Sequence, residues 1–191
     1  MRPGATPFFF PPGQSAEGLV ESLRGHGWRG EIVGPHGSGK SSLVSALIPA
    51  LRSAGRTTLL IELHDGQRRL PVDLRRASDL GSDAVVIVDG YEQLSFWSRV
   101  QLKGFCRRRG LGLLVTSHQP AGLPPLFRTA TSLALAQQIV GFFLQGRQEL
   151  VGPDELARRF QRHRGDLREL LFDLYDVYEQ RRGPQPGCEG Q

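Results

Sequence analysis

One stretch of eight residues limits what this chain can fold into, because Gly34–Ser41 fits the pattern G-x-x-x-x-G-K-[ST]. Glu31-Ile32-Val33 in front of it predicts the end of a short buried strand, and residues 41–51 predict a helix that begins inside the pattern. Glycines let such a loop curl so that successive backbone N–H groups point at one anion, and the helix N-terminus adds partial positive charge. The stretch therefore predicts a phosphate-binding loop between a strand and a helix.

Each residue of this loop has a predicted part in holding a nucleotide. The Lys40 ammonium is expected to reach the β- and γ-phosphates, and the Ser41 hydroxyl to ligate Mg²⁺. A glycine-rich turn that merely precedes a helix is the alternative. The residues expected to line the nucleotide are Gly34, Pro35, His36, Gly37, Ser38, Gly39, Lys40, Ser41 and Ser42.

A second acidic group for the metal follows the most apolar run of the chain. Residues 84–88 read AVVIV, which is typical of a strand buried on both faces of a parallel sheet, and Asp89 comes directly after them. An aspartate at the carboxyl end of such a strand is the usual second Mg²⁺ partner of a phosphate-binding loop. An aspartate can also end a strand for reasons of turn geometry. Asp89 is therefore predicted, with Ser41, as a metal ligand.

The rest of the chain alternates between strand and helix signals and then becomes helical. This order predicts an α/β fold with a parallel sheet and its ligand at the carboxyl ends of the strands. Further strands are predicted over 56–63, 84–88, 111–116 and 132–136, and further helices over 16–24, 72–77, 92–107, 137–145, 153–160 and from 165 onward.

These elements divide the chain into four predicted parts. Residues 1–14 form an extended arm, 15–136 a nucleotide-binding core, 137–182 a helical lid and 183–191 a disordered tail. The arm carries three consecutive phenylalanines, Phe8 to Phe10. They are placed either to wall a pocket for an adenine ring or to cover the edge of the core, and the sequence favours neither.

The residues after Asp89 carry a family resemblance. Asp89-Gly90-Tyr91-Glu92-Gln93-Leu94 resembles the D-G-x-D-E-L pattern of the NACHT and related STAND branch of AAA+-like NTPases. The resemblance implies that Glu92 polarises the attacking water. Gly90 stands where a catalytic acid often follows the aspartate, and Gln93 replaces the third acid, so slow hydrolysis is expected. The alternative for Glu92 is a carboxylate that interacts with a helix N-terminus.

Two later segments resemble the sensor motifs of the same class. Thr116-Ser117-His118 follows a strand where AAA+-like proteins place a polar group that reads the γ-phosphate, although turn capping by these residues is the alternative. Gly165 to Glu169 is similar to the G-[ND]-x-R-E motif of the lid and points to Arg168 as a γ-phosphate contact. A solvent-exposed ion pair is the alternative for Arg168. Arg128 is a weaker candidate for an arginine finger to a neighbouring subunit.

The resemblance extends over residues 15–182. It implies a three-layer P-loop NTPase sandwich with strand order 5-1-4-3-2, a small α-helical lid, and ATP with Mg²⁺ as ligands. Glu92, His118 and Arg168 are the residues that it assigns to catalysis. The function predicted in this way is an ATP-binding switch or assembly NTPase that hydrolyses ATP slowly, as a homo-oligomer or with a partner protein.

Charge and composition bear on whether the chain binds nucleic acid or a membrane. The net charge is +5, but of 24 basic residues only Lys40 and Lys103 are lysines, and the arginines are scattered in pairs, so nucleic-acid binding stays open without being favoured. No apolar run approaches the roughly 20 residues of a membrane helix. Two cysteines far apart in the sequence indicate reduced thiols and a cytoplasmic protein.

Two other functions fit the same motifs. A small-molecule kinase shares the phosphate loop and covers the phosphates with an arginine-rich lid. A nucleotide-sensing or nucleic-acid-binding adaptor uses the loop for binding alone and leaves Glu92 without a catalytic role. Turnover that requires a small acceptor distinguishes the first alternative, and salt-dependent DNA binding distinguishes the second.

Overall fold

The computed structural model describes residues 7–71, 80–144 and 151–182. The chain forms two compact units, Met1–Pro35 with Gly39–Ala130 and His36–Ser38 with Thr131–Gln191. The helix predicted over 72–77, the tail from 183 and the first six residues of the arm lie outside the described residues. None of the helices in the described part is long and apolar enough to cross a membrane.

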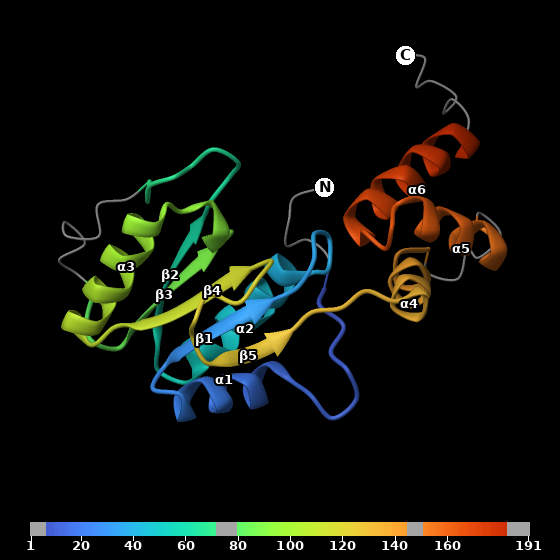
Figure 1. Ribbon diagram of the computed structural model, residues 1–191. Helices are drawn as coiled ribbons and strands as arrows, with labels where there is room; N and C mark the ends of the chain where they lie inside the picture. The colour runs from blue at the N-terminus through green and yellow to red at the C-terminus, as the bar shows by residue number, and fades with distance from the viewer. Residues whose placement is uncertain (1–6, 72–79, 145–150, 183–191) are drawn as a thin grey trace, which may run out of the picture. The chain divides into compact units, whose positions relative to one another are not determined.

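The first unit is built on one five-stranded sheet whose strand pairs are all parallel (Figure 1). The strand order is β2-β3-β4-β1-β5, which confirms the predicted order 5-1-4-3-2. In this order β1 lies between β4 and β5, so the loop after β1 begins at the carboxyl edge of the sheet beside the end of β4. The strands are β1 (Arg29–Val33), β2 (Thr57–Glu62), β3 (Ala84–Asp89), β4 (Gly112–Ser117) and β5 (Pro125–Arg128).

Helices cover both faces of this sheet. On one face α3 (Phe96–Arg109) packs its buried Leu102 and Cys106, and on the other face lie α1 (Ala16–Gly25) and α2 (Lys40–Ser53). Successive residues of β3 alternate between the two layers, with Val86 on the α3 side and Val85 on the side of α1 and α2. Residues 84–88 are all buried for this reason, and the three-layer sandwich predicted from their apolar run is confirmed.

The fifth strand lies elsewhere than predicted. Residues 132–136 do not form a strand: Ser132 caps a helix through its Oγ, which accepts a hydrogen bond from the Leu135 N–H at 3.1 Å. The strand is instead β5, within a proline-rich segment that reads as a loop. Proline is tolerated as the first residue of an edge strand, and β5 is an edge strand that begins with Pro125.

The helix predicted from Glu92 also begins later. Tyr91–Gln93 forms a 3₁₀ turn, Leu94 is extended, and α3 starts at Phe96 after Ser95. The Ser95 Oγ accepts a hydrogen bond from the Ser98 N–H at 3.3 Å, which marks Ser95 as the N-cap. Glu92 therefore lies in the 3₁₀ turn and not in the first turn of α3.

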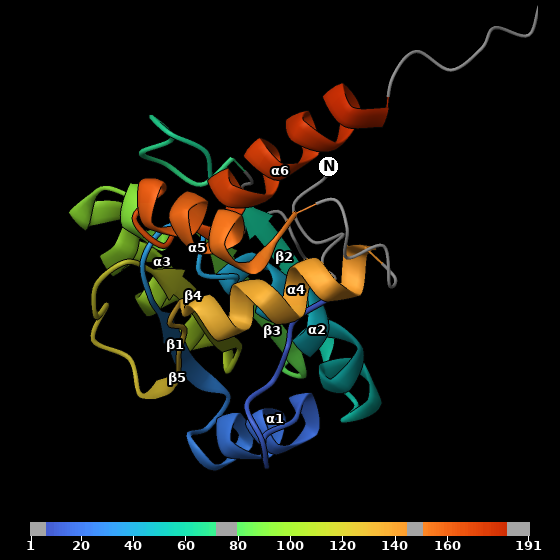
Figure 2. The same ribbon diagram turned by 90° about the vertical axis from the view of Figure 1, so that its right-hand side faces the viewer.

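The second unit contains α4 (Leu133–Leu144), α5 (Pro153–Arg162) and α6 (Leu167–Arg182), coloured orange to red in Figure 2. A half-buried ionic network joins the last two helices: Arg159 donates to Glu155 and to Asp173, each at 2.8 Å, and His163 lies 3.0 Å from Asp173. Burial alone would raise the pKa of Asp173, but the hydrogen bonds from His163 and Arg159 outweigh it and lower that pKa.

Tyr91 supplies a stability test of the first unit. Its side chain is 1% exposed and, among the described residues, its hydroxyl has no hydrogen-bond partner. Tyr91→Phe is expected to raise the free energy of unfolding by up to about 1 kcal/mol, because an unpaired buried hydroxyl is removed. Chemical denaturation of the full chain measures the change.

The same substitution has a predicted pH dependence. Burial raises the pKa of Tyr91 to about 12, above the roughly 10 of an unfolded tyrosine. As the pH rises between those values the unfolded tyrosine ionises first, so the free energy of unfolding of the wild type falls. The Phe variant should lose less stability over that range. Tyr175→Phe, at a side chain that is 55% exposed, is the matched control and should change nothing. A clear loss of stability at neutral pH in Tyr91→Phe would contradict the prediction.

Candidate functional site

The glycine-rich loop continues directly from the buried end of β1. The Gly34 N–H donates to the Ser117 carbonyl of β4 at 3.1 Å, which joins the start of the loop to the neighbouring strand. Gly37 and Gly39 have φ angles of 63° and 86°, a left-handed region that side chains rarely adopt. Gly39 is the N-cap residue of α2, so the loop turns into the helix at the position that the pattern predicts.

Lys40 extends back along its own loop. Its Nζ donates to the carbonyl oxygens of Gly34 and Pro35, both at 2.7 Å. This position holds the ammonium over the loop, where a phosphate oxygen could replace a carbonyl as its partner. Ser41 and Ser42 follow in the first turn of α2, and both are partly exposed.

Asp89 and Thr116 meet at the carboxyl ends of β3 and β4. The Thr116 hydroxyl donates to Asp89 Oδ1 and accepts from the Gly90 N–H at 3.0 Å. Thr116 is fully buried, so its hydroxyl orients the carboxylate from inside the sheet. The sequence predicts Thr116 as a γ-phosphate contact, and that role stays a prediction; the structure shows its hydroxyl bonded to Asp89 and to the Gly90 N–H.

Gly90 explains why no acid follows Asp89. Its φ angle is 83°, and a Cβ added there would lie 2.9 Å from the Leu63 carbonyl oxygen. Any side chain at this position meets both the left-handed backbone and a rigid carbonyl, so glycine is required. The 3₁₀ turn that follows brings the carboxylate of Glu92 to the same edge of the sheet.

Glu92 and His118 form a pair at this edge. His118 Nε2 lies 3.2 Å from Glu92 Oε1, and both side chains are 27% exposed. Among the described residues, the other carboxylate oxygen, Oε2, is buried without a hydrogen-bond partner. A buried acceptor of this kind is costly unless a ligand or water satisfies it. The pair thus has one oxygen held by His118 and one buried oxygen that no described residue satisfies.

Arg99 is a contributor that sequence reasoning missed. Its guanidinium donates to the Glu92 carbonyl at 2.7 Å through Nη2 and to the Leu94 carbonyl at 2.8 Å through Nε. These bonds tie the turn that carries Glu92 to the first turns of α3. No sequence signal marks the contact, because an arginine in an amphipathic helix is ordinarily a surface residue.

Other predicted site residues are placed as follows. Ser117 caps the turn after β4, its hydroxyl donating to the Gln119 carbonyl, which agrees with the turn-capping alternative. Arg128 is exposed at the end of β5. Arg168 is exposed in the first turn of α6 in the second unit, with its guanidinium carbon 5.8 Å from the Phe172 ring centroid. The roles of Arg128 and Arg168 toward a nucleotide stay predictions.

The described part of the arm packs on the first unit. Phe8 and Phe10 form an edge-to-face pair with centroids 4.9 Å apart, and Phe8 contacts Phe127 of β5 in the same way at 5.8 Å. Both rings lie against the core beneath α1 and α2, which is the core-covering role. Phe8 also lies beside the loop, since a Cβ added to Gly39 would be 3.6 Å from its ring. A wall for an adenine ring at this position stays a prediction.

Comparison with solved structures shows the class of fold. The chain is similar to the replication initiator DnaA in a structure bound to AMPPCP and single-stranded DNA, with a TM-score of 0.58 and 14% sequence identity. The alignment covers 90% of this chain and 66% of that one, so this chain spans just under two thirds of the initiator's length. At this identity the likeness shows the fold alone, a parallel α/β sandwich of the P-loop NTPase-like kind. No protein-family model and no curated protein sequence matches the chain.

Proposed function

We propose that the chain binds ATP with Mg²⁺ at the loop Gly34–Ser41 and hydrolyses it slowly, as a nucleotide-dependent switch or assembly factor. One observation carries the proposal: the loop and the Asp89–Thr116 pair lie at the carboxyl ends of adjacent strands β1, β4 and β3. Nucleotides bind at this edge in parallel α/β sheets. The AMPPCP that the similar DnaA structure holds is an ATP analogue, which further supports ATP as the ligand.

The residues at this edge fit a Mg²⁺-nucleotide. Lys40 already directs its ammonium at two carbonyl oxygens of the loop, and phosphate oxygens would take over these bonds. Asp89 and Ser41 would hold Mg²⁺. Among the described residues no cluster of three or more His, Cys, Asp or Glu side chains could hold a metal by itself. Mg²⁺ suits such a site, since it keeps several waters and binds through one or two carboxylates plus phosphate oxygens.

The pair Glu92–His118 supports a hydrolytic role. The unpartnered Oε2 of Glu92 is a hydrogen-bond acceptor that would orient a water toward the γ-phosphate, while His118 keeps the carboxylate in position. Arg168 would contact the γ-phosphate from the lid, as the motif resemblance implies. The rate is expected to be low because one carboxylate, engaged through Oε1, replaces the usual acid that Gly90 excludes.

Nucleotide binding with and without Mg²⁺ tests the proposal. ATP and GTP affinities are measured by calorimetry in Mg²⁺ and in EDTA, turnover by phosphate release, and assembly by size exclusion in each nucleotide state. Wild type should bind ATP more tightly in Mg²⁺, and Asp89→Asn should lose most of that difference. Equal ATP affinity in Mg²⁺ and EDTA for the wild type would count against the metal assignment, and absence of ATP binding would overturn the proposal.

The kinase alternative has one structural support. Gln93 Nε2 donates to Asp65 Oδ1 at 3.0 Å, which places a carboxylate of the β2 loop beside the turn that carries Glu92. A carboxylate there could serve an acceptor hydroxyl. ATP turnover that appears only when a small hydroxyl-bearing acceptor is added would favour a phosphotransferase over a switch.

A further inference from the structure

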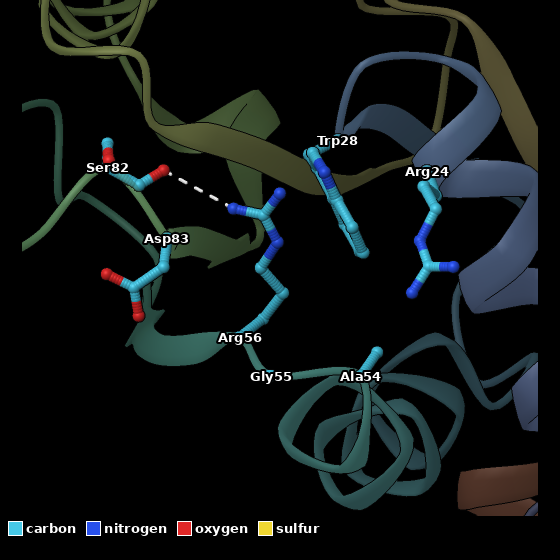
Figure 3. Close-up of a pocket in the computed structure, with 7 residues that line it drawn as sticks. All are labelled: Arg24, Trp28, Ala54, Gly55, Arg56, Ser82 and Asp83. Atoms are coloured by element: carbon cyan, nitrogen blue, oxygen red, sulfur yellow. Dashed lines mark hydrogen bonds between the residues drawn. The ribbon is translucent and has the colours of Figure 1, made fainter.

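A cavity lies at the edge of the sheet where the strands begin (Figure 3). Its volume is about 570 Å³. Three of its residues come directly before or at the starts of β1, β2 and β3, so it opens on the edge opposite the phosphate-binding loop. The cavity is lined by Arg24, Trp28, Ala54, Gly55, Arg56, Ser82 and Asp83.

Trp28 is the centre of this cavity. Its φ angle is 62°, an unfavourable value for a bulky side chain, and its backbone is fixed on both sides. The Trp28 N–H donates to the Leu23 carbonyl and its own carbonyl accepts from Leu113, both at 2.8 Å. The indole is held in this unusual conformation and lies between the side chains of Arg24 and Arg56 (Figure 3).

The two arginines differ in how firmly they are held. The Arg56 guanidinium carbon lies 3.9 Å from the indole centroid, and its Nη1 donates to the Ser82 carbonyl at 3.3 Å. The guanidinium carbon of Arg24 lies 5.5 Å from the centroid, and its half-exposed side chain forms an ion pair with the exposed Glu21 at 3.0 Å. A flat ligand could therefore displace Arg24 from the indole while Arg56 stays stacked on the opposite face.

Positive charge gathers around this cavity. α2 and α3 each connect two parallel strands and run back antiparallel to them, and α1 ends just before β1 begins, so the last turns of all three helices share this edge. All three last turns carry arginine, and the last turn of α3 adjoins the cavity because a Cβ added to its C-cap Gly110 would lie 3.9 Å from Ser82. Interaction with helix dipoles accounts for arginines in last turns, but not for Trp28 beside them. The arginines of these three last turns are Arg24, Arg52, Arg107, Arg108 and Arg109.

The carboxylate of Asp83 indicates that a ligand of this cavity carries hydrogen-bond donors as well as negative charge. Asp83 accepts a hydrogen bond from the Thr57 hydroxyl at 2.7 Å and lies at the same wall as Arg56. A simple polyanion gains nothing from a carboxylate there. A nucleotide could interact with the indole, the arginines and Asp83 together: its base stacks on the indole, its phosphate pairs with arginine, and N–H groups of the base donate to Asp83.

We propose that this cavity binds a phosphorylated nucleotide unit, with its base stacked on the Trp28 face opposite Arg56 and its phosphate held by the displaced Arg24. The site is separate from the ATP site and does not depend on it. The unit could be a free mononucleotide or one residue of a single-stranded nucleic acid, because both present the same base and phosphate. The experiment below distinguishes these two sources.

Tryptophan fluorescence tests the proposal, since the chain has only Trp28 and Trp97. Trp97→Phe leaves Trp28 as the single reporter, and added Lys40→Ala removes the ATP site from the measurement. This protein is titrated with AMP and with a 20-nucleotide oligodeoxythymidylate. We expect saturable quenching of Trp28 emission by at least about half, as stacked bases quench indole. Arg24→Gln and Arg56→Gln should each weaken binding about tenfold, and Arg158→Gln, an exposed arginine of α5, should not change it.

Salt dependence separates the two sources. Tight oligonucleotide binding that weakens steeply between about 50 and 200 mM salt, with weak AMP binding, indicates single-stranded nucleic acid. AMP binding as tight as that of the oligonucleotide indicates a free nucleotide. The proposal is overturned if neither probe quenches Trp28, if the oligonucleotide binds without changing its emission, or if Arg56→Gln and Arg24→Gln, shown to be folded by circular dichroism, quench as the parent does. Failure of ATP binding at Lys40 would leave this result unaffected.

Discussion

Lys40→Ala is expected to lower ATP affinity at least about 100-fold, the equivalent of about 2.7 kcal/mol. The Lys40 ammonium is the one charged side chain that the glycine-rich loop contributes, and it already bonds to two loop carbonyls at 2.7 Å. Charge-assisted hydrogen bonds to phosphate contribute about 1.5–3 kcal/mol each, so loss of the ammonium should remove most of the phosphate binding. Isothermal titration with ATP and Mg²⁺ measures the effect.

Lys103→Ala is the matched control for this experiment. Lys103 is the only other lysine of the chain, and its Nζ likewise donates to a backbone carbonyl, that of Ala121 at 2.6 Å. It belongs to α3 and lies outside the loop, so ATP affinity should stay within about twofold of wild type. ATP affinity that is unchanged in a folded Lys40→Ala protein would refute binding at the loop.

Glu92→Gln is expected to lower ATP turnover by about 10²–10³-fold and to leave ATP affinity within a few-fold of wild type. The amide keeps the size of the side chain and an oxygen opposite His118, but it cannot accept a proton from water. The loss should therefore appear in kcat. Phosphate release under single-turnover conditions, with ATP binding measured in parallel, separates the two quantities.

Glu62→Gln serves as its control. Glu62 ends β2 in register with Asp89, but its side chain is exposed, and turnover should be unchanged in this variant. Turnover that persists in Glu92→Gln would remove the assignment of Glu92 as the residue that orients water. The outcome for ATP binding in Lys40→Ala is independent of this result, so binding and hydrolysis are tested separately.

Local sequence was sufficient for much of the fold. The strands that end at Val33 and Asp89 and the helix that begins within Gly34–Ser41 were predicted because short-range patterns encode them: apolar runs for buried strands and glycines for the loop. The strand order followed from the motif resemblance, and the parallel pairings confirm it. The prediction of the fifth strand was wrong for two reasons. Pro125, the first residue of β5, is a residue typical of loops, and Ser132, which caps α4, lies in the segment predicted as the strand.

The candidate site could be predicted only in part, because its contacts join residues that are far apart in the sequence. Glu92 and His118 were each named from motif order, but their 3.2 Å contact joins residues 26 positions apart in the chain. The contact between Thr116 and Asp89 and the hydrogen bonds from Arg99 likewise cross between elements. No local pattern specifies such contacts, since they depend on the register of β3 against β4 and on where α3 begins.

The sequence by itself determined that a glycine-rich loop joins a buried strand to a helix, because glycine spacing and apolar runs act over a few residues. The tertiary structure alone decided what surrounds that loop and what lies opposite to it. The left-handed backbone and the nearby Leu63 carbonyl restrict position 90 to glycine, which leaves Glu92 as the acid beside His118. The fold also brings arginines that are far apart in the sequence to the edge where the strands begin, which is the edge that holds Trp28 and lies away from the loop.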